Sequence, residues 1–291
     1  MRNCAHCGVH RGLVTTMQTG GMCRSAALLL LLRRLPALLE QLDAEADTTV
    51  APAGLRLVEV IVVDDGSVDR TASILEESEH LDGRLRVIRF EANRGKGAAV
   101  RAGALGAVGQ RVLMTDVDLS TPLAEVLRLS AELDRGIDFA MGSRSLPDSR
   151  VLIHQPAHRE LAGKVFNLLF RITTGLPWRD TQCGFKLFDL ETTRRLFEVQ
   201  RIEGFAYDAE LCVNARRLGL RVVEVPVRWV NNTDTRVTLF GSSVRMALDL
   251  AKTVWRARRP LDASSSAPSE SSAALVDRTE VESSQEVGSN R

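Results

Sequence analysis

The sequence predicts an α/β fold in which a mostly parallel, Rossmann-like sheet is flanked by helices. Apolar runs rich in β-branched residues, such as residues 60–63, alternate with helix-forming segments from residue 57 onward. This alternation is typical of parallel strands, because each intervening helix carries the chain back across one face of the sheet. Helices then cover both faces, which explains why the strands are apolar throughout.

The expected elements follow one another along the chain with short connections. Strands are expected at residues 57–63, 85–90, 111–115, 138–142, 181–188 and 221–225, and helices at 69–79, 97–108, 122–133, 158–174, 190–198, 208–218 and 242–259. The strand segments are short, apolar and bounded by turn-forming residues, whereas the helical segments are longer and amphipathic.

The last expected helix, residues 242–259, has an apolar stripe and basic final turns. Val244, Leu248, Ala251 and Trp255 recur at three- and four-residue spacing. Two interpretations stay open. The helix packs on the core with its basic residues favoured at the C-terminus, or it lies at a membrane surface and contacts anionic headgroups.

Composition divides the chain into three parts. Residues 1–24 are rich in glycine and lack sustained periodicity, so we expect an aberrant, unstructured N-terminus. Residues 25–259 are expected to form the folded domain, beginning with a leucine-rich helical stretch at 25–43. Residues 260–291 are rich in serine and acidic residues, which predicts a disordered tail.

Charge and cysteine usage narrow the class of protein. The 291 residues carry a formal net charge of +1, which gives no support to nucleic-acid binding. Five scattered cysteines argue against a disulfide framework and favour a cytoplasmic location. Apolar runs fall short of the roughly 18 residues that a membrane-spanning helix needs, so we expect at most peripheral membrane contact.

The most informative motif is the pair Asp116 and Asp118, which follows an apolar run. Residues two apart share one face of an extended chain, so both carboxylates can reach one site beyond a strand end. Hard oxygen ligands in this arrangement suit Mg²⁺ or Mn²⁺ held mainly by the phosphates of a substrate. The alternative is a strand end with a helix cap, where aspartate is common. The neighbouring motifs favour the metal and a nucleotide diphosphate.

Two other strand ends also carry polar residues. Asp64 and Asp65 follow residues 60–63, where carboxylates can accept hydrogen bonds from a nucleobase or a ribose hydroxyl. Residues 93–97, Asn-Arg-Gly-Lys-Gly, place Lys96 at a helix start. This segment predicts either an anion site or a basic turn with a glycine-tolerant helix entry.

The second half of the chain offers candidate contacts for a second substrate. Arg144 and Arg159 can each clamp a phosphate, although a single arginine is more often a surface salt-bridge partner. Gln182 lies in a polar segment, residues 180–186, that leads into an apolar strand. Asp208 opens a helix, where the dipole favours an acidic residue, or it serves as a general base for an acceptor hydroxyl.

Taken together, these motifs resemble those of family-two glycosyltransferases of the GT-A fold. The matching motifs lie at residues 62–71, 93–97, 116–122, 142–144, 180–186, 207–210 and 224–229. The later ones are similar to those of dolichyl- or polyprenyl-phosphate glucosyltransferases. The resemblance covers about residues 33–258, and the ordered set is specific although each motif alone is common.

The resemblance implies an inverting transfer of a hexose, glucose in the first instance, from a UDP-sugar. Asp64 and Asp65 would hold the uridine, and Lys96 would contact the donor. Asp116 would contact the ribose or diphosphate, and Asp118, with Asp116 beside it, would ligate a divalent metal that neutralises charge on the departing UDP.

The same resemblance implies a polyprenyl or dolichyl phosphate as the acceptor. Arg144 and Arg159 match positions that bind its phosphate, with Gln182 as a further substrate contact. A phosphate oxygen is already ionised at neutral pH, so orientation and charge stabilisation would carry the catalysis. A second interpretation keeps the donor but takes a hydroxyl acceptor, for which Asp208 is essential as the base. A nicotinamide-dependent dehydrogenase is disfavoured, because no G-x-G-x-x-G follows the first clear strand.

The start of the chain departs from this family. Its members begin with a central strand that ends in a Pro-x-Tyr-Asn-Glu-like segment, which residues 15–32 do not match. We therefore expect the first strand to be missing or degenerate. Its loss would leave backbone groups of neighbouring strands unpaired, at about 1–3 kcal/mol for each buried group. This predicts weak or absent activity and a third interpretation, a non-catalytic remnant that binds nucleotide sugars.

Overall fold

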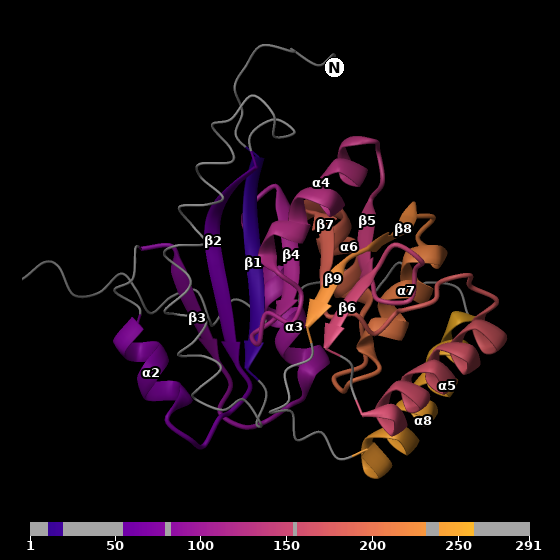
Figure 1. The fold of residues 1–291 in the computed structure, drawn as a ribbon. Coiled ribbons are helices and arrows are strands. Elements are labelled where there is room, and N and C mark those ends of the chain that lie inside the picture. The colour runs from indigo at the N-terminus through magenta and orange to yellow at the C-terminus, as the bar shows by residue number, and fades with distance from the viewer. Residues whose placement is uncertain (1–10, 20–54, 79–82, 154–155, 231–238, 259–291) are drawn as a thin grey trace, which may run out of the picture. The chain divides into compact units, whose positions relative to one another are not determined.

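The central element is a seven-stranded sheet with helices on both faces (Figure 1). The computed structural model describes residues 11–19, 55–78, 83–153, 156–230 and 239–258. The strands are ordered β3 (Leu85–Arg89), β2 (Leu55–Asp64), β1 (Arg11–Thr19), β4 (Arg111–Asp116), β7 (Lys186–Asp189), β5 (Phe139–Ser143) and β8 (Val222–Pro226). The α/β class and the mostly parallel sheet expected from the sequence are confirmed.

The first strand, expected to be missing or degenerate, is present. β1 falls within residues 1–24, which the sequence predicted to be unstructured, and it pairs in parallel with both β2 and β4. Its register places Thr19 beside Asp64 and Gln18 beside Asp116. The strand has β-branched residues but only brief apolar alternation between glycine-rich flanks, which hid it from a search for periodicity. The helical stretch expected at 25–43 and the tail expected at 260–291 lie outside the described residues.

β7 runs antiparallel to both of its neighbours, β4 and β5, whereas the other neighbouring pairs are parallel. Reversal changes which end of a strand lies at a given edge of the sheet. Residues 180–185, which precede β7, therefore lie at the same edge as the carboxyl ends of β4 and β5. The sequence predicted a strand over 181–188, but residues 181–185 belong to this loop instead.

Side-chain alternation divides the core between the two faces of the sheet. Val62 of β2 and Leu113 of β4 pack in one apolar cluster with α2 (Thr71–Ser78) and α4 (Val126–Asp134), which follows the short turn η1 (Leu123–Glu125). On the other face, Ile61 packs against α3 (Lys96–Gly106), and Met114 packs with α3, α6 (Leu190–Val199) and α7 (Tyr207–Arg217). The helices expected from residue 69 onward are present, with ends that differ by a few residues.

A second, two-stranded sheet was not expected from the sequence. It pairs β6 (Arg150–Ile153) in parallel with β9 (Arg228–Val230), and strands this short carry too few residues to show a period. β9 is also tied to the loop after β4. The Val230 N–H donates to the Ser120 carbonyl at 2.8 Å, and Arg228 Nε lies 2.6 Å from Glu125 Oε1.

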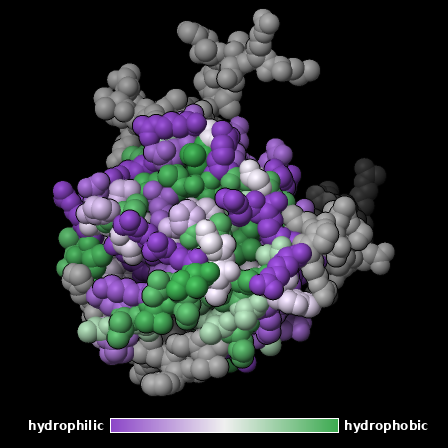
Figure 2. Space-filling view, turned by 90° about the vertical axis from the view of Figure 1, so that its right-hand side faces the viewer, coloured by the Kyte–Doolittle hydropathy of each residue, from purple (hydrophilic) through white to green (hydrophobic). Residues whose placement is uncertain are grey.

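Helices α5 (Ala157–Thr174) and α8 (Leu239–Ala257) pack against each other beside the main sheet (Figure 1). Their inner sides bury Phe170 and Leu250, but apolar residues also remain exposed on their outer sides. These exposed residues are Leu161, Val165, Leu168, Leu169 and Ile172 of α5 and Leu248 and Trp255 of α8, which we call the α5–α8 face. Figure 2, which looks at this side, shows hydrophobic residues gathered in its lower half among hydrophilic ones.

None of the helices in the described part of the chain combines the length and the apolar character that crossing a membrane requires.

Candidate active site

A tight turn after β4 presents the first two candidate residues. Asp116 ends the strand, and Asp118 follows within the turn. The Leu119 N–H donates to the Asp116 carbonyl at 3.1 Å, and the Ser120 N–H donates to Asp118 Oδ1 at 3.0 Å. Leu119 has a φ of 49°, a left-handed conformation that costs of order 1 kcal/mol for a residue with a side chain. Such local strain is typical of functional turns, and here it fixes the acidic pair at the sheet edge.

The Asp116 carboxylate is enclosed by a lysine and a glycine. Lys96, the first residue of α3, places its Nζ 2.6 Å from Asp116 Oδ1. Gly184 lies on the other side, where an added Cβ would come within 2.0 Å of Asp116 Oδ2. Burial disfavours the Lys96 ammonium, but the negative charges of Asp116, Asp208 and Asp118 outweigh it and raise the lysine pKa. The structure thus brings Lys96, Asp116 and Asp118 together, and their contact with a donor stays a prediction.

Asp118 meets the electrostatic requirement for a cation ligand. Burial and the neighbouring charge of Asp116 together raise its pKa, because both disfavour a second negative charge at this place. A divalent cation would relieve this repulsion. The described residues contain no group of three or more His, Cys, Asp or Glu placed to hold a metal. Two carboxylates fit Mg²⁺ or Mn²⁺ when substrate phosphates and water complete the shell.

Asp65 organises the loop that leads into α3. Its carboxylate accepts hydrogen bonds from the backbone N–H groups of Arg94 (2.7 Å) and Gly95 (2.9 Å) and from Asn93 Nδ2 (3.0 Å). Burial nevertheless leaves the pKa of Asp65 above the ordinary aspartate value. Asp64 is also buried, and its Oδ1 accepts the Ser67 N–H at 3.0 Å. Both carboxylates lie at the end of β2, and their contact with a nucleoside stays a prediction.

Most backbone N–H groups at the start of α3 already have acceptors within the protein, including the Gly95 N–H, which donates to Asp65. The Gly97 and Ala98 N–H groups donate to the Glu203 carbonyl at 2.7 and 3.2 Å. A Cβ on Gly97 would lie 2.3 Å from the Ile202 carbonyl oxygen, so only glycine allows this close approach. The glycine-tolerant helix entry is present, and an anion contact through the Lys96 side chain stays a prediction.

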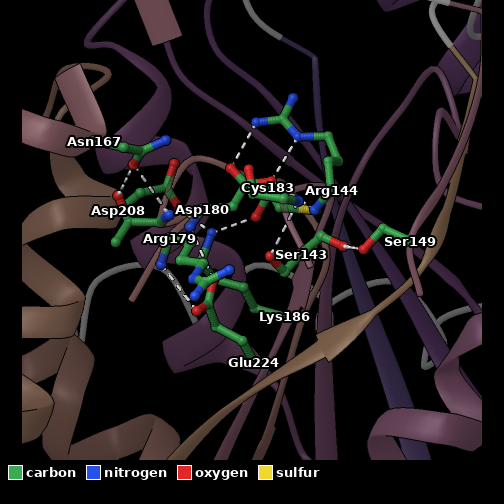
Figure 3. A network of polar contacts seen from close by, with 12 residues as sticks. Ser143, Arg144, Ser149, Asn167, Arg179, Asp180, Cys183, Lys186, Asp208 and Glu224 are labelled. Atoms are coloured by element: carbon green, nitrogen blue, oxygen red, sulfur yellow. Dashed lines mark hydrogen bonds and ion pairs between the residues drawn. The ribbon is translucent and has the colours of Figure 1, made fainter. Parts of the chain in front are cut away.

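Arg144, just after β5, is held by an aspartate that the sequence did not single out. Its Nε and one terminal nitrogen each lie 2.8 Å from an oxygen of Asp180, and its backbone N–H donates to the same carboxylate at 2.8 Å (Figure 3). The Trp229 ring centre lies 5.4 Å from the guanidinium carbon. Burial would raise the pKa of Asp180, but Arg144 outweighs it and lowers the pKa. The guanidinium is therefore fixed in direction, with further N–H donors left over.

The Asp180 loop is fixed from two sides. The backbone N–H groups of Arg179 and Asp180 donate to Glu224 of β8 at 2.9 and 2.8 Å. Asn167 of α5 accepts from the Thr181 hydroxyl at 3.2 Å (Figure 3). These contacts connect the loop with both the main sheet and α5.

Asp208, the first-turn residue of α7, is paired with a fully buried lysine. Lys186 Nζ lies 2.5 Å from Asp208 Oδ1 and also donates to the Cys183 carbonyl. Burial raises the pKa of Asp208, and the charges of Lys186 and Lys96 work against this rise. The sequence contained a signal for this pair, because the charged Lys186 stands directly between the apolar residues Phe185 and Leu187.

The two remaining candidates differ in how far the structure describes them. The buried Gln182 Nε2 has no hydrogen-bond partner among the described residues, so it can donate to a ligand oxygen. Arg159 lies in the first turns of α5, and its side chain is outside what the structure describes. Contacts of both residues with substrate stay predictions.

The sequence matches a known protein family. The model of "Glycosyl transferase family 2" matches residues 30–197. A dolichyl-phosphate β-glucosyltransferase of Drosophila melanogaster is 36% identical over 228 residues, which cover 75% of this chain and 69% of that protein. The human protein of the same name is 31% identical over 226 residues, covering 75% of this chain and 70% of the human one.

Solved structures are similar in fold. Glucosyl-3-phosphoglycerate synthase from Mycobacterium tuberculosis, crystallised with Mn²⁺, UDP and glucosyl-3-phosphoglycerate, has a TM-score of 0.58 at 18% identity, covering 84% of this chain and 80% of that one. Mannosyl-3-phosphoglycerate synthase from Rubrobacter xylanophilus has a TM-score of 0.55 at 18% identity, covering 84% and 73%. The chain therefore belongs to glycosyl transferase family 2 and is a glycosyltransferase with a GT-A-type fold.

Proposed function

We propose that this glycosyltransferase moves a hexose, glucose in the first instance, from a UDP-sugar to a polyprenyl or dolichyl phosphate with inversion at the anomeric carbon. The observation that carries the proposal is the turn that sets Asp116 and Asp118 beside Lys96. An acidic pair with an adjacent ammonium matches a divalent cation and the diphosphate it accompanies. The names of the relatives support the acceptor, since they act on dolichyl phosphate.

In the donor half of the site, different residues bind the uridine, the diphosphate and the metal. Asp64 and Asp65 hold the uridine, and Lys96 pairs with the diphosphate. Asp118 and Asp116 hold Mg²⁺ or Mn²⁺, which when bound supplies positive charge for the departing UDP. Asp65 also accepts hydrogen bonds from the loop just before Lys96. The same carboxylate therefore positions both the backbone that carries Lys96 and the substrate.

The acceptor half needs orientation more than proton removal. Arg144, aimed by Asp180, pairs with the acceptor phosphate together with Arg159 and Gln182. Asp208 is already paired with Lys186, which favours a charge-ordering role over that of a free base. This pairing supports the phosphate acceptor over a hydroxyl acceptor, whose proton would need a base.

The α5–α8 face fits the surface of an anionic membrane, from which a lipid phosphate could reach the site. Its exposed apolar residues are accompanied by Lys164 and Arg171 on α5 and by Arg245, Lys252 and Arg256 on α8. Apolar residues with surrounding cations are the pattern of an interfacial helix. Through Asn167 and Thr181, α5 also contacts the loop that holds Arg144. We place the protein at the cytoplasmic face of a membrane.

The test is a transfer assay with the full chain, UDP-glucose and a short polyprenyl phosphate, with Mn²⁺ or with EDTA. We expect transfer that EDTA abolishes, a large loss in Arg144→Ala and a smaller one in Asp208→Asn. Arg221→Ala is the control, because Arg221 forms a similar two-bond pair with Asp138 on an exposed surface. A larger loss in Asp208→Asn than in Arg144→Ala would favour the hydroxyl acceptor. UDP binding without turnover would mean a non-catalytic remnant.

Membrane contact is tested by flotation with anionic vesicles. Ile172→Glu on α5 is expected to reduce binding. Val108→Glu serves as the matched control, because Val108 is 69% exposed and Ile172 is 70% exposed. Equal binding by both variants and the unchanged protein would contradict the α5–α8 face as the contact surface.

A further inference from the structure

The Lys96 ammonium lies within an acidic cluster at the place where a metal is expected. It contacts Asp116 Oδ1 at 2.6 Å, and the charges of Asp208 and Asp118 also act on it. The lysine side chain is 19% exposed and the Asp116 side chain 40% exposed, so a ligand can reach both. The cation that compensates the charge of Asp116 in this structure is therefore one that the protein itself provides.

A lysine and a divalent cation compete for Asp116. Lys96 holds Oδ1 of this carboxylate, and Oδ2 faces Gly184, where even an added Cβ would have no room. A dication that binds beside the ammonium is repelled by it, and this repulsion is strong where water is partly excluded. The metal gains the full attraction of Asp116 and Asp118 only after Lys96 has moved to another anion.

Two neighbouring cations are paired with carboxylates other than Asp116 and Asp118. Arg94, two residues before Lys96, lies 2.5 Å from Glu203, and Lys186 is buried against Asp208. Lys96 can release its partner without moving its backbone. The start of its helix is fixed by the Gly97–Glu203 hydrogen bond, whereas its side chain is a flexible four-carbon stem. A fixed base with a mobile ammonium allows the charge to move without any change in the backbone.

We propose that Lys96 is an internal substitute for the metal, so that the divalent cation binds tightly only after a nucleotide diphosphate has drawn the ammonium away from Asp116. This inference rests on the nucleotide and metal chemistry proposed above. It makes diphosphate and metal binding cooperative, since each favours the state in which Lys96 has left Asp116. It also compensates the charge of Asp116 while the donor site is empty.

The test measures the Mn²⁺ dissociation constant of the full chain by the electron paramagnetic resonance signal of free Mn²⁺, with and without UDP. For the unchanged protein we expect UDP to tighten Mn²⁺ binding on the order of tenfold or more. Lys96→Gln is expected to tighten Mn²⁺ binding without UDP by a similar factor and to shrink the effect of UDP. Lys96→Met, which keeps the length of the stem, should behave in the same way, and thermal unfolding verifies that both variants fold.

Arg94→Gln is the matched control, because it removes one positive charge from the same loop without touching Asp116. It should bind Mn²⁺ like the unchanged protein in both conditions. If UDP promotes Mn²⁺ binding but neither Lys96 variant tightens it without UDP, the substitute role is wrong and the proposed function stands. If the unchanged protein binds neither Mn²⁺ nor UDP, the proposed function fails and this inference fails with it.

Discussion

Arg144 and Asp180 join the sheet edge to the loop before β7 through two side-chain hydrogen bonds of 2.8 Å each. The pair spans 36 residues of sequence, and the Asp180 side chain is only 1% exposed. A carboxylate this well buried is stable in its charged form because the guanidinium matches it in shape and charge. The pair therefore fixes both the loop and the direction of the arginine.

Asp180→Asn is expected to weaken both the fold and the acceptor site. Removing one partner of a buried pair destabilises a protein by about 3 kcal/mol, because the other charge loses its compensation. We also expect KM for the acceptor to rise more than kcat falls, since Arg144 loses its direction. Urea unfolding and steady-state kinetics measure the two effects. Asp138→Asn breaks the exposed pair with Arg221 and should cost much less stability; equal costs would contradict the structural role of Asp180.

Gly184→Ala is expected to disturb Asp116 directly. The added methyl group would lie 2.0 Å from Asp116 Oδ2, so the carboxylate or the loop must move. A displacement of about 1 Å at a reacting site can reduce the rate about a hundredfold. Transfer activity and Mn²⁺ binding in the presence of UDP are the measurements. Gly163→Ala on α5 is the control, because nothing lies within 4 Å of the new Cβ, and alanine should stabilise the helix by up to about 1 kcal/mol.

Asp118→Asn is expected to stabilise the metal-free protein while it abolishes metal-dependent transfer. Burial and Asp116 raise the pKa of Asp118, so the folded state resists its negative charge at neutral pH. A neutral amide removes this repulsion but is a poorer ligand for a hard cation. Thermal unfolding in EDTA should show a higher Tm for the variant, and the transfer assay should show no turnover. A lower Tm would mean that the carboxylate stabilises the turn more than its charge destabilises it.

Glu210→Gln is expected to change how stability depends on pH. Burial raises the pKa of Glu210, although it accepts the Ile202 and Arg201 N–H groups at 2.7 and 3.0 Å. The folded state thus holds the proton more tightly than the unfolded state, and ionisation lowers stability as the pH rises from the ordinary glutamate pKa through the folded one. The variant has no such proton to lose. Its stability relative to the unchanged protein should improve between pH 5 and pH 8 in urea unfolding.

The control for this pH dependence is Asp138→Asn. Hydrogen bonds from Arg221 lower the pKa of Asp138, so the stability that its charge contributes is lost only below the ordinary aspartate pKa. The change in stability of this variant should therefore be the same at pH 5 and pH 8. A parallel response of the two variants would contradict the assignment of the slope to Glu210.

The sequence was most informative where a local pattern determines the structure. The acidic pair, the β-branched strands and the amphipathic helices could be predicted, because each depends on residues that are close in the chain. β1 was missed because its place between β2 and β4 comes from pairing with residues far along the sequence. Pairing partners were missed for the same reason. Asp180 and Lys186 were part of recognised motifs, but only the fold brings them to Arg144 and Asp208.

The position of β1 has a consequence for how the chain acquires its structure during synthesis. β1 leaves the ribosome before both of the strands that flank it. Both of its edges therefore stay unpaired until β2 and then β4 have been synthesised. An open edge is a place where chains pair wrongly with one another. We expect low yield and aggregation when β2 and β4 emerge long after β1, so slower elongation after residue 19 should lower the soluble yield and faster delivery of residues 55–64 should raise it.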